Sequence, residues 1–165
     1  MIFVTVGSQK FQFNRLLRKV DELVKEKKIT EEVFAQIGNS DYLPKNFRWT
    51  RFMDREKFEK MMEDSNIIIT HGGTGVIIKS IKLGKKTIVI PRQKAFKEHV
   101  DDHQKQIARE FDQKFVETVY DIDDLEQKLN EIKEKKFEKY VSNTNNIISS
   151  IRKFIESDIK WKKEF

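Results

Sequence analysis

A glycine-rich turn between two apolar segments is the stretch of the chain whose residue types most clearly suggest chemistry. Residues 67–70 (IIIT) are β-branched throughout, which is typical of a strand buried in a parallel sheet. His71-Gly72-Gly73-Thr74-Gly75 follows, and apolar residues at helical spacing resume at Val76. A strand, a glycine turn and a helix leave free backbone N–H groups at the positive end of the helix. This order therefore predicts a binding site for a phosphate group.

The residues of this turn have both structural and chemical interpretations. Gly72, Gly73 and Gly75 could merely make a tight turn, but one glycine is enough for that, so three in four positions favour close approach by a ligand. The Thr74 hydroxyl could add a contact to a diphosphate. His71 could donate to a phosphate or act as an acid or base, although a single histidine at a strand end is more often a structural hydrogen-bonding residue. His71 is still the one catalytic candidate that the sequence offers.

Two further predicted turns carry polar residues. Gly7, Ser8 and Gln9 follow the first apolar run, and Arg92 and Lys94 follow a later one. Ligands of open α/β sheets bind just beyond the carboxyl ends of the strands, so these residues are candidates for the same site. Ser8 could equally be an ordinary helix cap. Arg92 and Lys94 could supply positive charge to a diphosphate or lie in a solvated loop, and we favour the first interpretation.

A cluster of acidic, imidazole and amide side chains occurs at Asp101-Asp102-His103-Gln104. It could simply be the start of a helix, since carboxylates there complement the helix dipole. His99 and His103 are four residues apart and, with Asp102, could also bind a metal ion, which we regard as the weaker interpretation.

Composition limits the classes of function. The 165 residues suffice for one domain with a core, and the net charge of +6 favours anionic partners such as nucleotide phosphates, nucleic acid or an anionic membrane face. Basic and aromatic residues form no strip on one strand, so we expect no nucleic-acid partner. The absence of cysteine excludes disulfides and thiolate zinc sites. With no long apolar run and no signal peptide, we expect a cytoplasmic protein.

Strand and helix patterns alternate along the chain. Strands are predicted at residues 2–6, 32–37, 47–52, 67–70, 87–90 and 115–119, the third with the alternation of a half-buried edge strand. Helices are predicted at residues 13–24, 54–62, 76–83, 99–111, 121–136 and 142–158. This order predicts an α/β fold with a single Rossmann-like, doubly wound, mostly parallel sheet and a C-terminal helix. We expect a domain at residues 1–140 and a C-terminal helix with a basic tail at residues 141–165.

Three segments together carry a family resemblance. They are IFVTVGS at the start, ITHGGTG through LGKKTIVIPRQK in the centre, and EHVDDHQ after it. In this order and spacing they resemble the donor-binding half of glycosyltransferase family 28, of GT-B architecture, over roughly residues 1–120. The resemblance is to short, free-standing members: bacterial exopolysaccharide or capsule galactosyltransferase subunits, and the catalytic subunit of the dolichol-linked N-acetylglucosaminyltransferase.

The resemblance implies a site for a UDP-sugar and no requirement for a metal or another cofactor. His103 and Gln104 match a His-Gln pair that reaches the donor-sugar hydroxyls, a task suited to an imidazole and an amide. Lys79 departs from many family members, in which a glutamate at this position binds the ribose hydroxyls. The implied UDP-sugar-binding residues are Gly7, Ser8, Gln9, His71, Gly72, Gly73, Thr74, Gly75, Arg92, His103 and Gln104.

The resemblance also implies a reaction and a partner. The chain would be the catalytic subunit of an inverting transferase that moves a hexose or N-acetylhexosamine to a polyprenyl-diphosphate-linked acceptor in surface polysaccharide synthesis. A membrane-anchored subunit would hold the acceptor, complete the cleft and recruit this chain to the cytoplasmic face of the membrane. The general base would be His71 or a residue of that subunit, and this chain would be inactive alone. The alternative is a non-catalytic nucleotide-binding or regulatory subunit, which Lys79 makes conceivable.

Overall fold

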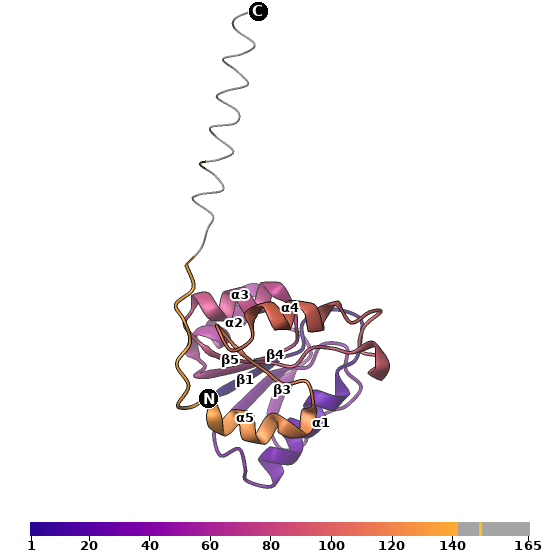
Figure 1. Ribbon diagram of the computed structural model, residues 1–165. Coiled ribbons are helices and arrows are strands. Elements are labelled where there is room, and N and C mark those ends of the chain that lie inside the picture. The colour runs from indigo at the N-terminus through magenta and orange to yellow at the C-terminus, as the bar shows by residue number, and fades with distance from the viewer. Residues whose placement is uncertain (142–148, 150–165) are drawn as a thin grey trace, which may run out of the picture.

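The sheet forms the centre of the computed structural model, which describes residues 1–141 and 149 (Figure 1). Its six strands are all parallel and lie in the order β3-β2-β1-β4-β5-β6. The strands are β1 (Ile2–Thr5), β2 (Val33–Gln36), β3 (Arg48–Thr50), β4 (Ile67–Thr70), β5 (Lys86–Val89) and β6 (Glu117–Thr118). The α/β, Rossmann-like prediction is confirmed. The predicted helix at 142–158 and most of the predicted unit 141–165 lie outside the described residues.

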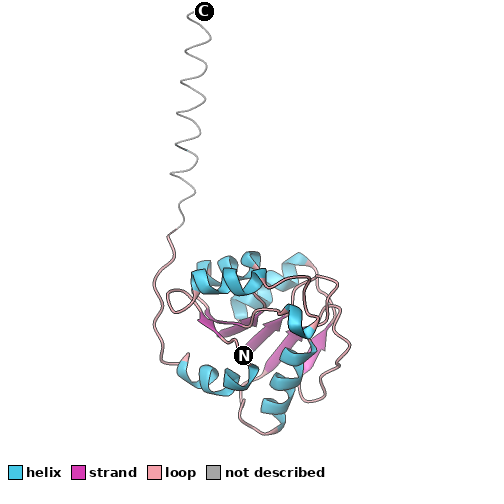
Figure 2. Ribbon diagram, turned by 45° about the vertical axis from the view of Figure 1, so that its right-hand side comes forward, coloured by secondary structure: helices cyan, strands magenta, loops and turns pink. Residues whose placement is uncertain are grey.

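Helices cover both faces of the sheet (Figure 2). The α-helices are α1 (Asn14–Lys25), α2 (Arg55–Asp64), α3 (Thr74–Lys82), α4 (His103–Phe111) and α5 (Leu125–Glu131), and short 3-10 turns are η1 (Lys94–Phe96) and η2 (Ile122–Asp124). One face packs against α1 and α5, and the other against α2, α3 and α4. Helices on both faces explain why the central strands β1 and β4 are buried along their whole length and rich in β-branched residues.

Alternation along β1 shows how one strand serves both layers. Ile2 and Val4 belong to the core beneath α1 and α5, whereas Phe3 packs with Met62 of α2 and Ile68 of β4 on the opposite face. Successive side chains of a strand point to opposite faces, so every residue of β1 is buried.

The strand order creates a topological switch point between β1 and β4. After β1 the chain adds β2 and β3 on one side, then crosses over to add β4, β5 and β6 on the other. Thr5 of β1 lies opposite Thr70 of β4, so the loops that follow these residues diverge from adjacent strand ends. Ligands of open α/β sheets bind in the crevice outside such a point.

The predicted elements differ from the observed ones mainly at their ends. The helix predicted from residue 99 begins at His103, because residues 94–102 form η1 and a loop in which Lys97 has a φ of 56°. The helix predicted to reach residue 136 ends at Glu131 as α5, and the following segment carries Phe137 back onto the core. The edge position predicted for the third strand is confirmed by β3.

Candidate functional site

The imidazole of His71 occupies the centre of the switch point. A Cβ atom added to Gly73 would lie 2.3 Å from His71 Nε2, and one added to Gly7 would lie 2.7 Å from His71 Cε1. Gly7 also has a φ of 77°, in the left-handed region that favours glycine. The loops after β1 and β4 therefore enclose the ring on two sides, and both glycines are needed for it to fit.

His71 is a neutral base in this environment. Its side chain is almost fully buried, and burial, followed by the charge of Arg92, lowers its pKa from 6.5 to about 4. Thr70 Oγ1 donates to the Thr5 carbonyl at 3.2 Å and lies 3.3 Å from His71 Nδ1. A Thr70 hydroxyl that donates to the Thr5 carbonyl can accept from Nδ1, an arrangement in which Nδ1 carries the ring proton and Nε2 is the acceptor nitrogen.

The first turn of α3 provides unsatisfied donors beside this histidine. Gly73 is the N-cap and supplies no side-chain cap, and the first helical bond runs from Ile77 N to the Gly73 carbonyl at 3.2 Å. Within residues 1–141 no acceptor is found for the N–H groups of Thr74 and Gly75, and both residues are exposed. A Cβ at Gly75 would meet no atom within 4 Å. These donors, at the positive end of a helix, suit a phosphate.

Gln104 of α4 connects the loop after β4 to the loop after β5. Its Oε1 accepts from Gly72 N at 3.0 Å and from Arg92 N at 3.1 Å, and the residue is only 3% exposed. A Cβ at Gly72 would lie 2.7 Å from Gln104 Cβ, so this glycine allows α4 to approach the turn. The amide oxygen expected to contact a sugar hydroxyl is thus bonded to the backbone, whereas neighbouring His103 is exposed at the start of α4.

Arg92, expected beside a diphosphate, has its guanidinium directed inward. It donates to the carbonyls of Val6 at 2.6 Å, Gln12 at 2.8 Å, Phe11 at 3.1 Å and Glu98 at 3.2 Å. Burial lowers its pKa from 12.5 to about 10, so it remains charged at neutral pH. Arg92 therefore connects the loop after β1 to the loop after β5. Its positive charge is buried and does not face solvent.

A buried carboxylate, which was not among the predicted site residues, helps to hold the loop after β5 in place. Glu98 is fully buried and accepts from Arg15 Nε at 3.0 Å, from Arg15 Nη2 at 3.0 Å and from Gln93 N at 3.0 Å. A bidentate arginine–carboxylate pair is among the strongest charge-assisted contacts in proteins. A glutamate within a charged loop carries no periodic signal, so only the fold identifies it.

Most of the remaining residues singled out in the sequence are exposed near the switch point, whereas Lys79 points towards α2. Ser8, Gln9, Thr74, Lys94 and His103 are exposed on loops or helix starts that follow the carboxyl ends of the strands. Lys79 instead lies along α3 and forms an ion pair with Glu59 of α2. Among the described residues no group of three or more His, Asp and Glu side chains could hold a metal ion. Open N–H groups, an exposed hydroxyl and an exposed imidazole can together bind an anionic, oxygen-rich ligand.

Comparison with known proteins identifies the class to which this fold and site belong. Residues 1–157 match the glycosyltransferase family 28 C-terminal domain, and the chain belongs to this family. The glycotransferase of kitacinnamycin has a similar fold, with a TM-score of 0.59 at 16% identity, over 81% of this chain and 35% of that one.

Two curated relatives carry the same description, UDP-N-acetylglucosamine transferase subunit ALG13. The one from Candida albicans is 33% identical over 98 residues, which are 59% of this chain and 32% of that protein. The one from Mus musculus is 25% identical over 115 residues, which are 66% of this chain and 10% of that protein. The chain thus spans a third or less of the length of these relatives. None of the described helices is long and apolar enough to cross a membrane.

Proposed function

We propose that this protein is the donor-binding, catalytic subunit of an inverting glycosyltransferase that uses a UDP-sugar. The observation that carries the proposal is the unsatisfied first turn of α3 at the switch point of a family 28 C-terminal domain. The similarity to subunits described as UDP-N-acetylglucosamine transferases supports UDP as the nucleotide. The sugar would be a hexose or N-acetylhexosamine, and the acceptor a polyprenyl-diphosphate-linked sugar of a surface polysaccharide.

The proposed chemistry is direct displacement at the anomeric carbon. The N–H groups of Thr74 and Gly75 would stabilise negative charge on the departing UDP, aided by the dipole of α3. His103, Ser8 and Gln9 would contact the donor from neighbouring loops. Buried Arg92 would fix the geometry of these loops and contribute its charge without direct contact.

The general base of the proposed reaction is assigned to the partner. With a pKa of about 4, His71 is a weak base at neutral pH, and its Nε2 lies against Gly73 and Gly7. This chain contributes one Rossmann-like sheet, whereas a GT-B cleft is formed between two such domains. A membrane-anchored subunit that holds the lipid-linked acceptor would supply the second wall and the base.

Substitution of Thr74 tests the phosphate contact. Thr74→Pro removes one N–H at the first helical position, where proline is tolerated, and Gly73 before it has the extended backbone that precedes proline (φ −82°, ψ 119°). Thr74→Val is the matched control, since it removes the hydroxyl and keeps the N–H. By calorimetry we expect Thr74→Pro to weaken UDP binding about tenfold or more, the value of one charge-assisted hydrogen bond. We expect Thr74→Val to have a smaller effect.

Nucleotide selectivity decides whether the proposal stands. UDP-N-acetylglucosamine or UDP-galactose should bind in preference to ADP, and a chain that bound no uridine nucleotide would exclude the proposed function. The inward-facing Gln104 oxygen keeps a second candidate open, a non-catalytic nucleotide-binding or regulatory subunit. In that case UDP would bind, yet the chain combined with its partner and acceptor would release no UDP from the UDP-sugar.

A further inference from the structure

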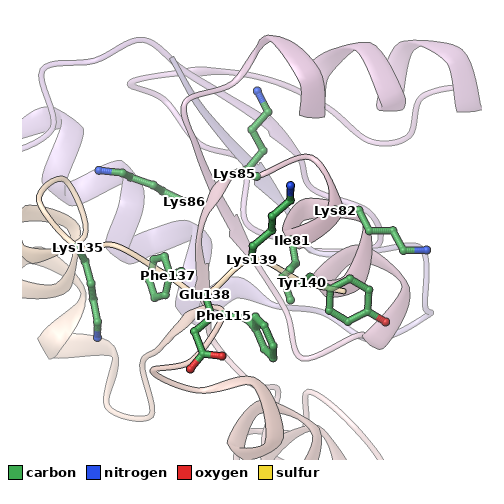
Figure 3. A pocket seen from close by; sticks show the side chains of 11 residues that line it. Ile81, Lys82, Lys85, Lys86, Phe115, Lys135, Phe137, Glu138, Lys139 and Tyr140 are labelled. Carbon is green, nitrogen blue, oxygen red and sulfur yellow. The ribbon is translucent and has the colours of Figure 1, made fainter. Parts of the chain in front are cut away.

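A lysine-rich cavity lies at the amino-terminal end of β5, and the switch-point loops lie at the opposite, carboxyl ends of the strands. Its volume is about 360 Å³, and it is formed where the end of α3 leads into β5 and where residues 135–140 pass beside them. Figure 3 shows the lysine side chains extending from the cavity in several directions, with the rings of Phe115 and Tyr140 between them. The size lies within the range of ~300–1,000 Å³ that is usual for small-molecule sites.

The cavity has an excess of positive charge. Five lysines and one glutamate line it. Glu138 is paired with Lys114, which lies outside the lining, and Lys135 is paired with buried Glu117. For Lys82 and Lys139 no anionic partner is found in the part of the chain that the structure describes. Several lysines on one part of the surface, with fewer carboxylates to balance them, create a local positive potential that attracts anions.

The remaining two lysines are held in place by backbone carbonyls. Lys85 donates to the carbonyl of Glu63 and Lys86 to that of Lys133. These contacts orient the ammonium groups without neutralising them. Both lysines and Gly84 also line a neighbouring hollow of about 430 Å³, so the positive surface continues past the cavity.

The cavity also has an apolar part. Phe115 and Tyr140 meet edge to face with ring centroids 5.9 Å apart, and Ile81 lies beside them. A ligand that fits both parts carries a phosphate for the lysines and an apolar or aromatic body for the rings.

We infer that this cavity is a second binding site, for a phosphorylated small molecule with an apolar or aromatic body. The site is separate from the one at the switch point, because it lies at the amino-terminal end of β5 and the switch-point loops lie at the carboxyl ends of β1 and β4. A flat anionic membrane is the less suitable ligand, since contact at this edge would leave the switch-point loops facing away from the bilayer.

Phenyl phosphate and inorganic phosphate are the probes that test this site. Each is titrated into the isotope-labelled full chain, and amide shifts are followed by NMR. We expect phenyl phosphate to shift the amides of Gly84, Lys86 and Tyr140 and to bind more tightly than inorganic phosphate, because only the former contacts the rings. Equal affinity for the two probes, or shifts confined to Gly72–Gly75, would overturn the inference.

Two double variants distinguish binding in this cavity from attraction of the probe by the net charge of the protein. Lys82→Gln with Lys139→Gln should weaken phenyl phosphate binding about tenfold, as expected for two lost charge contacts. Lys45→Gln with Lys60→Gln removes the same charge from exposed positions outside this cavity and should leave binding unchanged. Equal weakening by both pairs would show that net charge alone attracts the probe and would refute the site.

Binding to lipid vesicles tests whether the phosphate recognised by this cavity belongs to a membrane lipid and not to a small molecule. Phosphatidylglycerol and phosphatidylcholine vesicles are compared in sedimentation with both double variants. If the Lys82/Lys139 pair abolished binding to phosphatidylglycerol vesicles while phenyl phosphate caused no shift at Gly84, the cavity would be a membrane contact and the inference would be wrong. The expected result is that the probe shifts these amides and that the two double variants sediment equally with the vesicles.

Discussion

Most of the glycines around His71 are required by side chains of the same chain and not by a ligand. The group that approaches Gly7 and Gly73 is the imidazole of the same chain, and at Gly72 it is Gln104. Of these four glycines, Gly75 alone faces open space. The pattern of three glycines in four positions correctly indicates a crowded backbone, but from the sequence alone a ligand cannot be distinguished from a folded side chain as the cause.

Alanine substitution distinguishes a glycine packed against a side chain, Gly73, from one that faces open space, Gly75. Gly73→Ala must displace His71, and we expect it to lower the free energy of unfolding by about 1–3 kcal/mol, as overpacking does. Gly75→Ala meets no atom and lies in a helix, so we expect a gain of about 0.5–1 kcal/mol. Urea denaturation measures both changes. Equal effects of the two substitutions would contradict the packing of His71 described above. If a diphosphate lies against Gly75, its alanine variant should also bind UDP more weakly.

His71 also makes stability depend on pH. Its pKa is about 4 in the folded protein, against about 6.5 when unfolded, so the unfolded chain binds more protons between these values. The contribution is fully present above pH 6.5 and is lost as the pH falls towards 4. We expect about 3 kcal/mol less stability at pH 4 than at pH 7 from this residue. Urea denaturation across this range should show a shallower dependence in His71→Gln, and an unchanged dependence would refute the assignment.

At the scale of elements, the segment between β5 and α4 is the part of the site that depends most on tertiary contacts. Strands and helices with clear apolar periodicity were predictable because each buries a face whose spacing is visible in the sequence. Residues 91–102 have no such spacing. Their order comes from Arg92, which donates to the distant Val6 carbonyl, and from Glu98, which accepts from the side chain of Arg15 and from the N–H of Gln93. For the same reason the inward direction of Gln104 was not predictable, because its partners belong to two other loops.

Removal of the Glu98 charge tests this support. Glu98→Gln keeps the shape of the side chain but leaves Arg15 without its buried partner and removes the negative charge beside Arg92. We expect a loss of about 2–4 kcal/mol in the free energy of unfolding, as for other broken buried pairs. Glu110→Gln is the control, since this glutamate is exposed on α4, and we expect a change within about 0.5 kcal/mol. A loss below about 1 kcal/mol for Glu98→Gln would show that the network does not hold the loop.

At the scale of the whole molecule, the sheet predicts a gradient of stability. β1 and β4 each pair on both sides and are buried on both faces, whereas β3 and β6 are short edge strands. Local opening therefore exposes the edges at lower cost than the centre. In hydrogen exchange we expect amides of β1 and β4 to exchange only through global unfolding and those of β3 and β6 to exchange faster. Uniform protection across the sheet would contradict this order.

The central place of β1 has a consequence for how the molecule is made. A ribosome releases β1 before either of its neighbours, so the partner of Ile2 in β2, Val33, becomes available before its partner in β4, Ile67. Until β4 emerges, the apolar side of β1 that later packs with Ile68 and Met62 has no cover. Arg92 emerges later still and then closes onto the carbonyls after β1. Nascent chains that end before β4 are thus expected to expose this apolar surface and to aggregate more readily than chains in which the switch point has formed.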